Sequence, residues 1–294
     1  MSHDHDPCLE ELKVDGVLLG SLDQWDAEDV RRRWTIATGD GCMNITFTST
    51  DLSHAFVSEP LRPYRFSILR WCDSDGSGES LVSGGGNWLP QIHAIDCLPP
   101  DTCPVSGVLS RAKELINGIL TPPLRSFVRA VLADRYVHDH FWTTPASMRH
   151  HHARPGGLAL HSVEVAEDMA SQGQLTDTEH DLGVAAGLLH DIGKVWSYTR
   201  DMFLSEQGIA MGHELIGLCR LEPHLRELEH QWSHGAFAMR VLLSGCGRMR
   251  GEGSMPLALL ARVRACDQRS CERSAGSPHR PGRSWTPEPY DTPF

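Results

Sequence analysis

Hydrophobic residues between positions 12 and 98 occur in short runs that glycine, aspartate, serine and proline separate. Short apolar runs bounded by such turn-forming residues are typical of strands joined by turns. The pattern predicts strands at 16–22, 34–37, 44–49, 64–71 and 91–95. We therefore expect residues 1–98 to form a small β domain, built as an antiparallel barrel or a sandwich.

After Pro99 and Pro100 the hydrophobic residues recur every three or four positions, which is the period of an amphipathic helix. The pattern predicts a helical connector over 99–145. It also predicts a helical domain over 146–271, with helices at 157–172, 177–191, 209–229, 234–244 and 256–271. Residues 272–294 are rich in proline and poor in apolar side chains, so we expect a disordered tail. The predicted fold class is α+β.

The composition excludes several classes of protein. A chain with 40% hydrophobic and 22% charged residues is expected to be globular. It has no apolar run long enough to span a membrane, and its first residues lack the pattern of an export signal, so we expect a cytoplasmic protein without a membrane partner. The nine cysteines lack the close pairing of a disulfide framework or a thiolate zinc site, which predicts reduced thiols. The net charge of −11 argues against a protein that coats nucleic acid indiscriminately.

Histidine is concentrated in one part of the chain, since 12 of the 17 histidines lie between His138 and His234. Three of the predicted helices also carry polar side chains where the spacing calls for core residues. These side chains are His161, the pair His190 and Asp191, and Asp267. Burying such groups without partners would cost several kcal/mol, so they are either bonded internally or coordinate a cation.

Two imidazoles and two carboxylates form a nitrogen and oxygen donor set that suits a divalent cation such as Mn²⁺, Fe²⁺, Mg²⁺ or Ni²⁺. The alternative for any single position is ordinary: one inward histidine can be satisfied by hydrogen bonds in the core, and one inward aspartate can cap a turn or pair with arginine. Three such positions in the same helical half favour the metal site over that alternative.

The order of these residues resembles a known family. His161, then the segment 189–194 with the sequence Leu-His-Asp-Ile-Gly-Lys, then Asp267 are similar to the H…HD…D signature of the HD superfamily of metal-dependent phosphohydrolases. Residues 145–166 are similar to two branches of that superfamily, the HD domain of TraI-like proteins of conjugative transfer and the YhaM-type 3′ to 5′ exoribonucleases. In the second branch an OB-like β domain precedes the HD domain, which implies an OB-like barrel or another barrel for residues 1–98. The resemblance covers roughly 103–271.

The resemblance implies a role for each matching position. It assigns the metal ligands to His161, His190, Asp191 and Asp267. Asp191, which would bridge two ions, and Lys194, which could reach a substrate phosphate, are the implied catalytic residues. His213 and His234 are candidates for a second ion, although this chain has Ser233 and His234 where the exonuclease branch has adjacent histidines. The candidates for substrate binding are His151, His152 and Arg154. The alternative to these roles is that Lys194 lies solvated at a helix end and that His234, His151 and His152 lie in solvent-exposed loops.

The implied activity is metal-dependent hydrolysis of a phosphate ester, in which a metal-bound water attacks phosphorus without a covalent protein intermediate. The expected substrate is a nucleotide or a single-stranded RNA or DNA. Two alternatives stay open at this stage: an accessory DNA-processing protein of conjugative transfer, and a non-catalytic scaffold with a structural metal. Imidazoles must be neutral to bind metal, so activity is expected to fall as the pH drops through about 6. The sequence does not indicate an oligomeric state.

Overall fold

The computed structural model describes residues 8–22, 32–47, 61–72, 80–82, 86–148, 152–199, 203–245 and 254–275. The chain divides into two compact units, one formed by residues 1–102 with 133–135 and the other by 103–132 with 136–294. Among the described residues, the strands all belong to the first unit, and the second unit is helical. The predicted α+β class, with a β barrel followed by a helical domain, is confirmed. The first four residues of the predicted tail, 272–275, are helical instead, and the rest of it lies outside the described residues.

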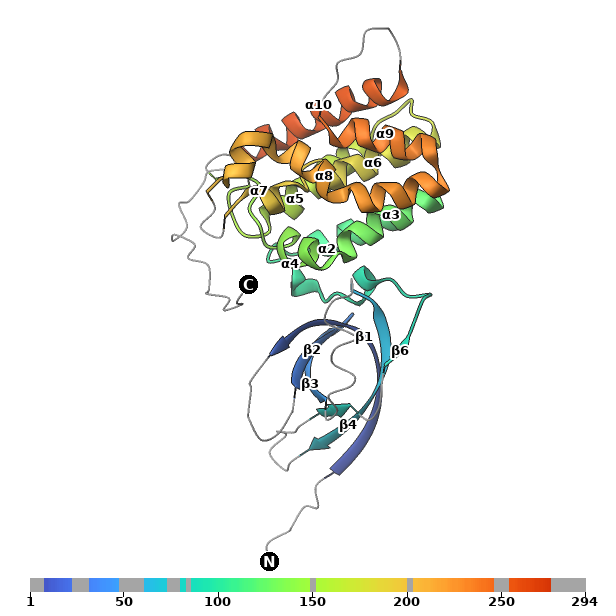
Figure 1. The fold of residues 1–294 in the computed structure, drawn as a ribbon, viewed down its shortest axis with the longest axis vertical. Coiled ribbons are helices and arrows are strands. Elements are labelled where there is room, and N and C mark those ends of the chain that lie inside the picture. The colour runs from blue at the N-terminus through green and yellow to red at the C-terminus, as the bar shows by residue number, and fades with distance from the viewer. Residues whose placement is uncertain are drawn as a thin grey trace, which may run out of the picture. The chain divides into compact units, whose positions relative to one another are not determined.

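The β unit is a closed barrel (Figure 1). Its strands are β1 (Cys8–Leu22), β2 (Arg32–Thr38), β3 (Gly41–Phe47), β4 (Pro63–Cys72), β5 (Ser80–Val82) and β6 (Asn87–Trp88). The strands follow the order β1-β2-β3-β5-β4, and β4 pairs with β1 to close the ring, while β6 adds to β4. All these pairs are antiparallel except β3 with β5, which is parallel. This is a five-stranded Greek-key barrel of the OB-like kind that the resemblance implied.

Alternation along the strands explains how the barrel interior is filled. Trp34 and Ile36 on β2, and Phe66 and Ile68 on β4, are buried at every second position, so one face of each strand fills the interior. The strand predicted at 91–95 is wrong, because this segment forms a turn and the 3₁₀ helix η1 (Ala94–Cys97).

The helical unit consists of nine helices among the described residues. They are α2 (Val108–Gly118), α3 (Pro122–Ala133), α4 (Arg135–Phe141), α5 (Gly157–Ala170), α6 (Asp177–Leu189), α7 (Lys194–Ser197), α8 (Glu206–Gln231), α9 (Ser233–Leu243) and α10 (Met255–Ala275). Helix α5 packs along α6, and α10 packs against both (Figure 1). No helix in the described part of the chain is long and apolar enough to cross a membrane.

The close approach of α5 and α6 depends on Gly187. A Cβ atom at this position would lie 2.7 Å from the Cα of Ala166, which is closer than real side chains come. Because α6 has no side chain here, the two helix backbones nearly touch, and both helices are buried along this line. The contact brings the C-terminal end of α6, capped by His190, beside the part of α5 that carries His161.

Candidate metal centre

The cluster forms where α6 ends. His190 is the C-cap of α6, Asp191 follows in the turn, and α7 begins at Lys194. Gly193 lies in this turn because α8 passes against it: a Cβ at Gly193 would be 1.8 Å from the backbone oxygen of His213. Helix α8 is itself broken just before this point, since Gly212 has φ 74° and ψ 156° inside the helix. The turn and the break together place His213 next to the aspartate of the turn.

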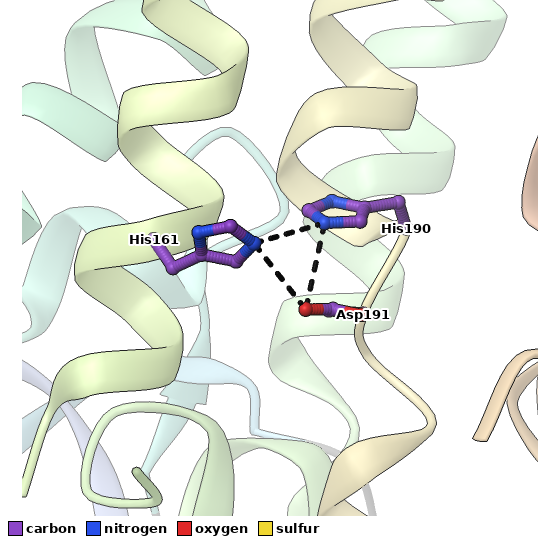
Figure 2. Close-up of side chains that lie close together, drawn as sticks. All are labelled: His161, His190 and Asp191. Carbon is purple, nitrogen blue, oxygen red and sulfur yellow. Dashed lines mark hydrogen bonds and ion pairs between the residues drawn. The ribbon is translucent and has the colours of Figure 1, made fainter. Parts of the chain in front are cut away.

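Four side chains from three helical regions converge on one another. The Nε2 atom of His161, on α5, lies 3.3 Å from Nε2 of His190 and 3.4 Å from Oδ2 of Asp191 (Figure 2). It also lies 3.1 Å from Oδ1 of Asp267, on α10. His190 Nε2 is 3.5 Å from Asp191 Oδ2 and 4.0 Å from Asp267 Oδ1. The ligand atoms of His161, His190 and Asp191 all lie within 4.8 Å of one another.

These separations fit the residues around a divalent cation. Ligands at about 2.1 Å from a Mg²⁺-like ion in octahedral geometry are about 3.0 Å apart when they are adjacent. The shortest donor separations in the cluster are close to that spacing, and the donors are two nitrogens and two carboxylate oxygens, a set that suits several transition metals. The cluster can therefore hold a divalent cation, whose identity the donor set alone does not fix.

The outer nitrogen of each imidazole is engaged, which leaves Nε2 directed at the cluster. His190 Nδ1 lies 2.9 Å from the backbone oxygen of Gly187. A carbonyl oxygen only accepts, so Nδ1 carries the hydrogen and Nε2 is free to coordinate. His161 Nδ1 lies 3.0 Å from Oγ of Ser270, on α10. Partners on the outer nitrogen are the usual way in which proteins orient a metal-binding histidine.

The charges in the cluster shift the pKa values of its members. Burial alone would lower the pKa of His161, but hydrogen bonds to Asp191 and Asp267 outweigh it and raise the pKa to about 9. The pKa of His190 is lowered, chiefly by burial. Burial would raise the pKa of Asp191, yet the charges of His190 and Lys194 hold it well below its usual value. His161 thus carries a proton at the position where a cation would bind.

The two oxygens of Asp191 face different groups. Oδ2 faces the cluster and also accepts a hydrogen bond from Lys194 Nζ at 2.6 Å. Oδ1 lies 2.9 Å from Nε2 of His213. Lys194 is 8% exposed, and its pKa is raised because attraction to Asp191 outweighs the cost of burial. An aspartate with one oxygen on each side is placed to bridge two cations; the second ion itself stays a prediction.

Of the other predicted residues, His152 lies beside the cluster, with its ring centre 5.7 Å from that of His161. His234 is exposed near the start of α9, and no contact in the described part of the chain joins it to the four side chains. His152 is 8% exposed and bonds to polar groups of α5 and α10 on the Nδ1 side of His161. Arg154 is exposed, and its backbone nitrogen donates to the oxygen of His152. His151 lies outside the described residues. Roles in substrate binding for these residues stay predictions.

Sequence reasoning missed three residues that support the cluster: Glu164, Ser270 and Cys271. Cys271 lies one turn after Asp267, and its Sγ donates to Oδ1 of that aspartate at 3.5 Å. Burial, together with the nearby charge of Asp267, raises the pKa of this thiol to about 12. Helical spacing places each of the three on the same helix face as a predicted ligand, three or four positions after it, but does not show what its side chain contacts.

Comparison with known proteins agrees with this geometry. Residues 158–263 match the HD domain family. Over 142 residues the chain is 32% identical to the "3'-5' exoribonuclease YhaM" of Listeria innocua. The aligned segment covers 47% of this chain and 44% of that protein. The protein of the same name from Shouchella clausii is 27% identical over 168 residues, covering 56% of this chain and 51% of that protein. The matched part thus spans about half the length of these curated relatives. No solved structure matches.

The helical unit therefore contains an HD domain at residues 158–263, and the predicted likeness to the HD superfamily and to its YhaM-type branch is confirmed. The family match ends at residue 263 and does not include Asp267, which the structure places 3.1 Å from His161. The likeness to TraI-like proteins of conjugative transfer is not tested by these matches and stays a prediction.

Proposed function

We propose that this protein is a metal-dependent phosphohydrolase that cleaves phosphodiester bonds of single-stranded nucleic acid, with RNA the preferred substrate. The observation that carries the proposal is the convergence of His161, His190, Asp191 and Asp267, with both Nε2 atoms turned inward. The likeness to proteins named 3′-5′ exoribonuclease supports RNA as the substrate.

Each side chain of the cluster has a task in such a reaction. A divalent cation held by His161, His190, Asp191 and Asp267 would supply an activated water and offset negative charge on the phosphoryl oxygens. Lys194 keeps Asp191 ionised and fixed in direction, and its ammonium adds a positive charge beside the position of a bound phosphate. Because both oxygens of Asp191 are engaged, this carboxylate can orient groups on two sides.

Exposure indicates the side from which a substrate would approach. The side chain of His161 is fully buried, whereas that of Asp267 is 41% exposed and that of His213 is 30% exposed. The deep wall of the cluster is therefore built by α5, and the open side lies between α8 and α10. A phosphate that enters there reaches Asp267 and His213 before the buried imidazole.

The barrel supports single-stranded nucleic acid as the substrate. Barrels of this topology commonly bind oligonucleotides, and bases stack on exposed aromatic side chains beside arginines. Trp88 on β6 is 57% exposed, and the guanidinium carbon of Arg62 lies 5.7 Å from its ring centre. A base could stack on this ring while the arginine attracts a phosphate.

The test compares metal content and hydrolysis in matched variants. The purified protein is analysed for metal and assayed with Mn²⁺ on bis-p-nitrophenyl phosphate, on labelled RNA and on labelled single-stranded DNA. His190→Ala is expected to lose both bound metal and hydrolysis, whereas His230→Ala, which removes an exposed histidine of α8, keeps both. Hydrolysis that survives in His190→Ala would overturn the site. Wild-type protein that binds metal but cleaves none of these substrates would overturn the activity and favour a structural metal.

A further inference from the structure

A chain of polar groups lies on the Nδ1 side of His161, away from the proposed cation. Ser270 Oγ is 3.0 Å from His161 Nδ1 and 2.6 Å from Glu164 Oε2. His152 Nε2 lies 3.2 Å from the same carboxylate oxygen and 3.4 Å from Ser270 Oγ. His161 and Ser270 are fully buried, and His152 is 8% exposed. The reaction proposed above uses none of the three residues beyond His161.

The directions of these hydrogen bonds follow from the groups involved. The hydroxyl of Ser270 has a single hydrogen, which it donates to Glu164. Its oxygen is then left to accept from His161, so the ring hydrogen of His161 lies on Nδ1. The carboxylate of Glu164 is ionised: burial would raise its pKa, but hydrogen bonds from His152 and Ser270 lower it below the usual value. A negative charge thus lies behind the hydroxyl that holds the imidazole.

We propose that Ser270 and Glu164, held in place by His152, are positioning residues that fix the Nδ1–H tautomer of His161 and aim its Nε2 at the bound cation. This inference rests on the metal centre of the proposed function. A carboxylate behind the outer nitrogen of a ligating histidine orients the ring and makes the coordinating nitrogen more basic. Here the serine hydroxyl passes that influence from Glu164 to the ring.

The ligands and their supporting residues come from the same two helices, α5 and α10. Glu164 lies three positions after His161 on α5, and Ser270 lies three positions after Asp267 on α10. Each helix therefore supplies one ligand and one supporting group on the same face, one turn apart. The two nitrogens of His161 face side chains of the same helix α10, Asp267 at Nε2 and Ser270 at Nδ1.

The loop before α5 is also fixed in this position. His152 has φ 47°, a left-handed conformation that non-glycine residues adopt rarely and at a cost of order 1 kcal/mol. Its backbone nitrogen donates to Oγ of Ser274 on α10 at 3.0 Å. Contacts at both the backbone and the ring thus hold His152 against the carboxylate of Glu164, as expected if the surrounding structure requires it there.

The experiment measures the affinity for Mn²⁺, which does not depend on hydrolysis. Competition with a chromophoric chelator compares the wild type with Ser270→Ala, Ser270→Thr and Glu164→Gln. Glu167→Gln is the matched control, because it removes a carboxylate of the same helix that pairs with Arg111 instead. We expect Ser270→Ala and Glu164→Gln to bind Mn²⁺ about 10- to 100-fold more weakly. Ser270→Thr, which keeps the hydroxyl, and Glu167→Gln are expected to stay near the wild-type affinity.

A second measurement separates positioning from a general loss of stability. Nitrogen NMR of labelled histidine reports which ring nitrogen of His161 carries the hydrogen. With Mg²⁺, which is diamagnetic, the wild type is expected to show the Nδ1–H form of a coordinated ring, and folded Ser270→Ala to keep a fraction of its rings in the Nε2–H form, which cannot coordinate. Folded Ser270→Ala and Glu164→Gln with Mn²⁺ affinities within twofold of the wild type would overturn the inference.

The outcomes also distinguish this inference from the proposed function. If the wild type binds Mn²⁺ but hydrolyses none of the substrates, the proposed activity is wrong, while the Mn²⁺ affinities of the variants still test the positioning role. If the wild type binds Mn²⁺ no better than His190→Ala does, both the metal centre and the positioning role are wrong.

Discussion

At the scale of single residues, protonation of His161 makes the free energy of unfolding depend on pH. Its pKa of about 9 in the folded protein lies above the ordinary 6.5. Protonated His161 therefore stabilises the metal-free fold fully below about pH 6.5, and this contribution is lost as the pH rises through 9. Urea unfolding of metal-free protein is expected to show this loss in the wild type and not in His161→Gln. Equal pH dependence in both proteins would contradict the assignment.

The same proton must leave when a cation binds. For an imidazole with the ordinary pKa, metal binding is expected to weaken only as the pH falls through about 6. With the pKa of His161 near 9, the apparent affinity for Mn²⁺ should instead keep rising above neutrality, by up to about tenfold per pH unit. Calorimetry in buffers of different ionisation enthalpy is expected to show a proton released per ion near pH 7.5. An affinity that is flat from pH 7 upward would rule out displacement of this proton.

The ligands could be predicted from the sequence, and their supports could not. His161 and Asp267 stand out because each interrupts an apolar helix face, and His190 and Asp191 because they end one. Ser270 and Glu164 are polar residues of ordinary helices, and only the packing of α10 against α5 brings them together. Their roles depend on contacts over about a hundred positions of sequence, which periodicity does not encode.

At the scale of elements, the contact of α5 with α6 sets the distance across the metal centre. In Gly187→Ala the new Cβ would meet the backbone of Ala166, so the helices must separate. We expect a loss of about 1–3 kcal/mol in unfolding free energy, typical of overpacking, together with weaker Mn²⁺ binding. Gly118→Ala is the control, since a Cβ there meets no atom within 4 Å. The importance of the contact would be refuted if the two variants behaved alike.

The helices lie close to the ranges that their hydrophobic period predicts, whereas some of the short strands do not. The segment 91–95 was predicted as a strand, yet it forms a turn and a 3₁₀ helix after Pro90. The first part of β1 was missed because its charged side chains, among them Glu10 and Glu11, interrupt the apolar alternation. This part is a strand because it pairs with β4, from Cys8 with Cys72 to Asp15 with Arg65, partners 50 to 64 residues away. Local pattern cannot contain that information.

At the scale of the whole molecule, an OB-like barrel and an HD domain lie on one chain. Their order was predicted from the resemblance, but closure of the barrel depends on the long-range pairing of β1 with β4 and of β3 with β5. Under the proposed function, the two parts would divide the work: the barrel would hold single-stranded nucleic acid, and the HD domain would cleave it.

Under that division, the exposed tryptophan of the barrel should matter for binding. Trp88→Ala is expected to weaken binding of a single-stranded RNA oligonucleotide by about 1–3 kcal/mol at constant salt, the usual value of one stacked base. Phe237→Ala, which removes an exposed aromatic side chain of the HD domain, serves as the control. Fluorescence anisotropy measures both. Equal affinities for wild type and Trp88→Ala would exclude stacking at this position.

The central claim is that side chains far apart in sequence hold one cation between them. Crystals grown with Mn²⁺ and measured at a wavelength where manganese scatters anomalously test it most directly. The account predicts an anomalous peak about 2.0–2.3 Å from Nε2 of His161, Nε2 of His190, Oδ2 of Asp191 and Oδ1 of Asp267. Crystals that contain manganese only elsewhere, with these four atoms bonded to one another or to water, would contradict it.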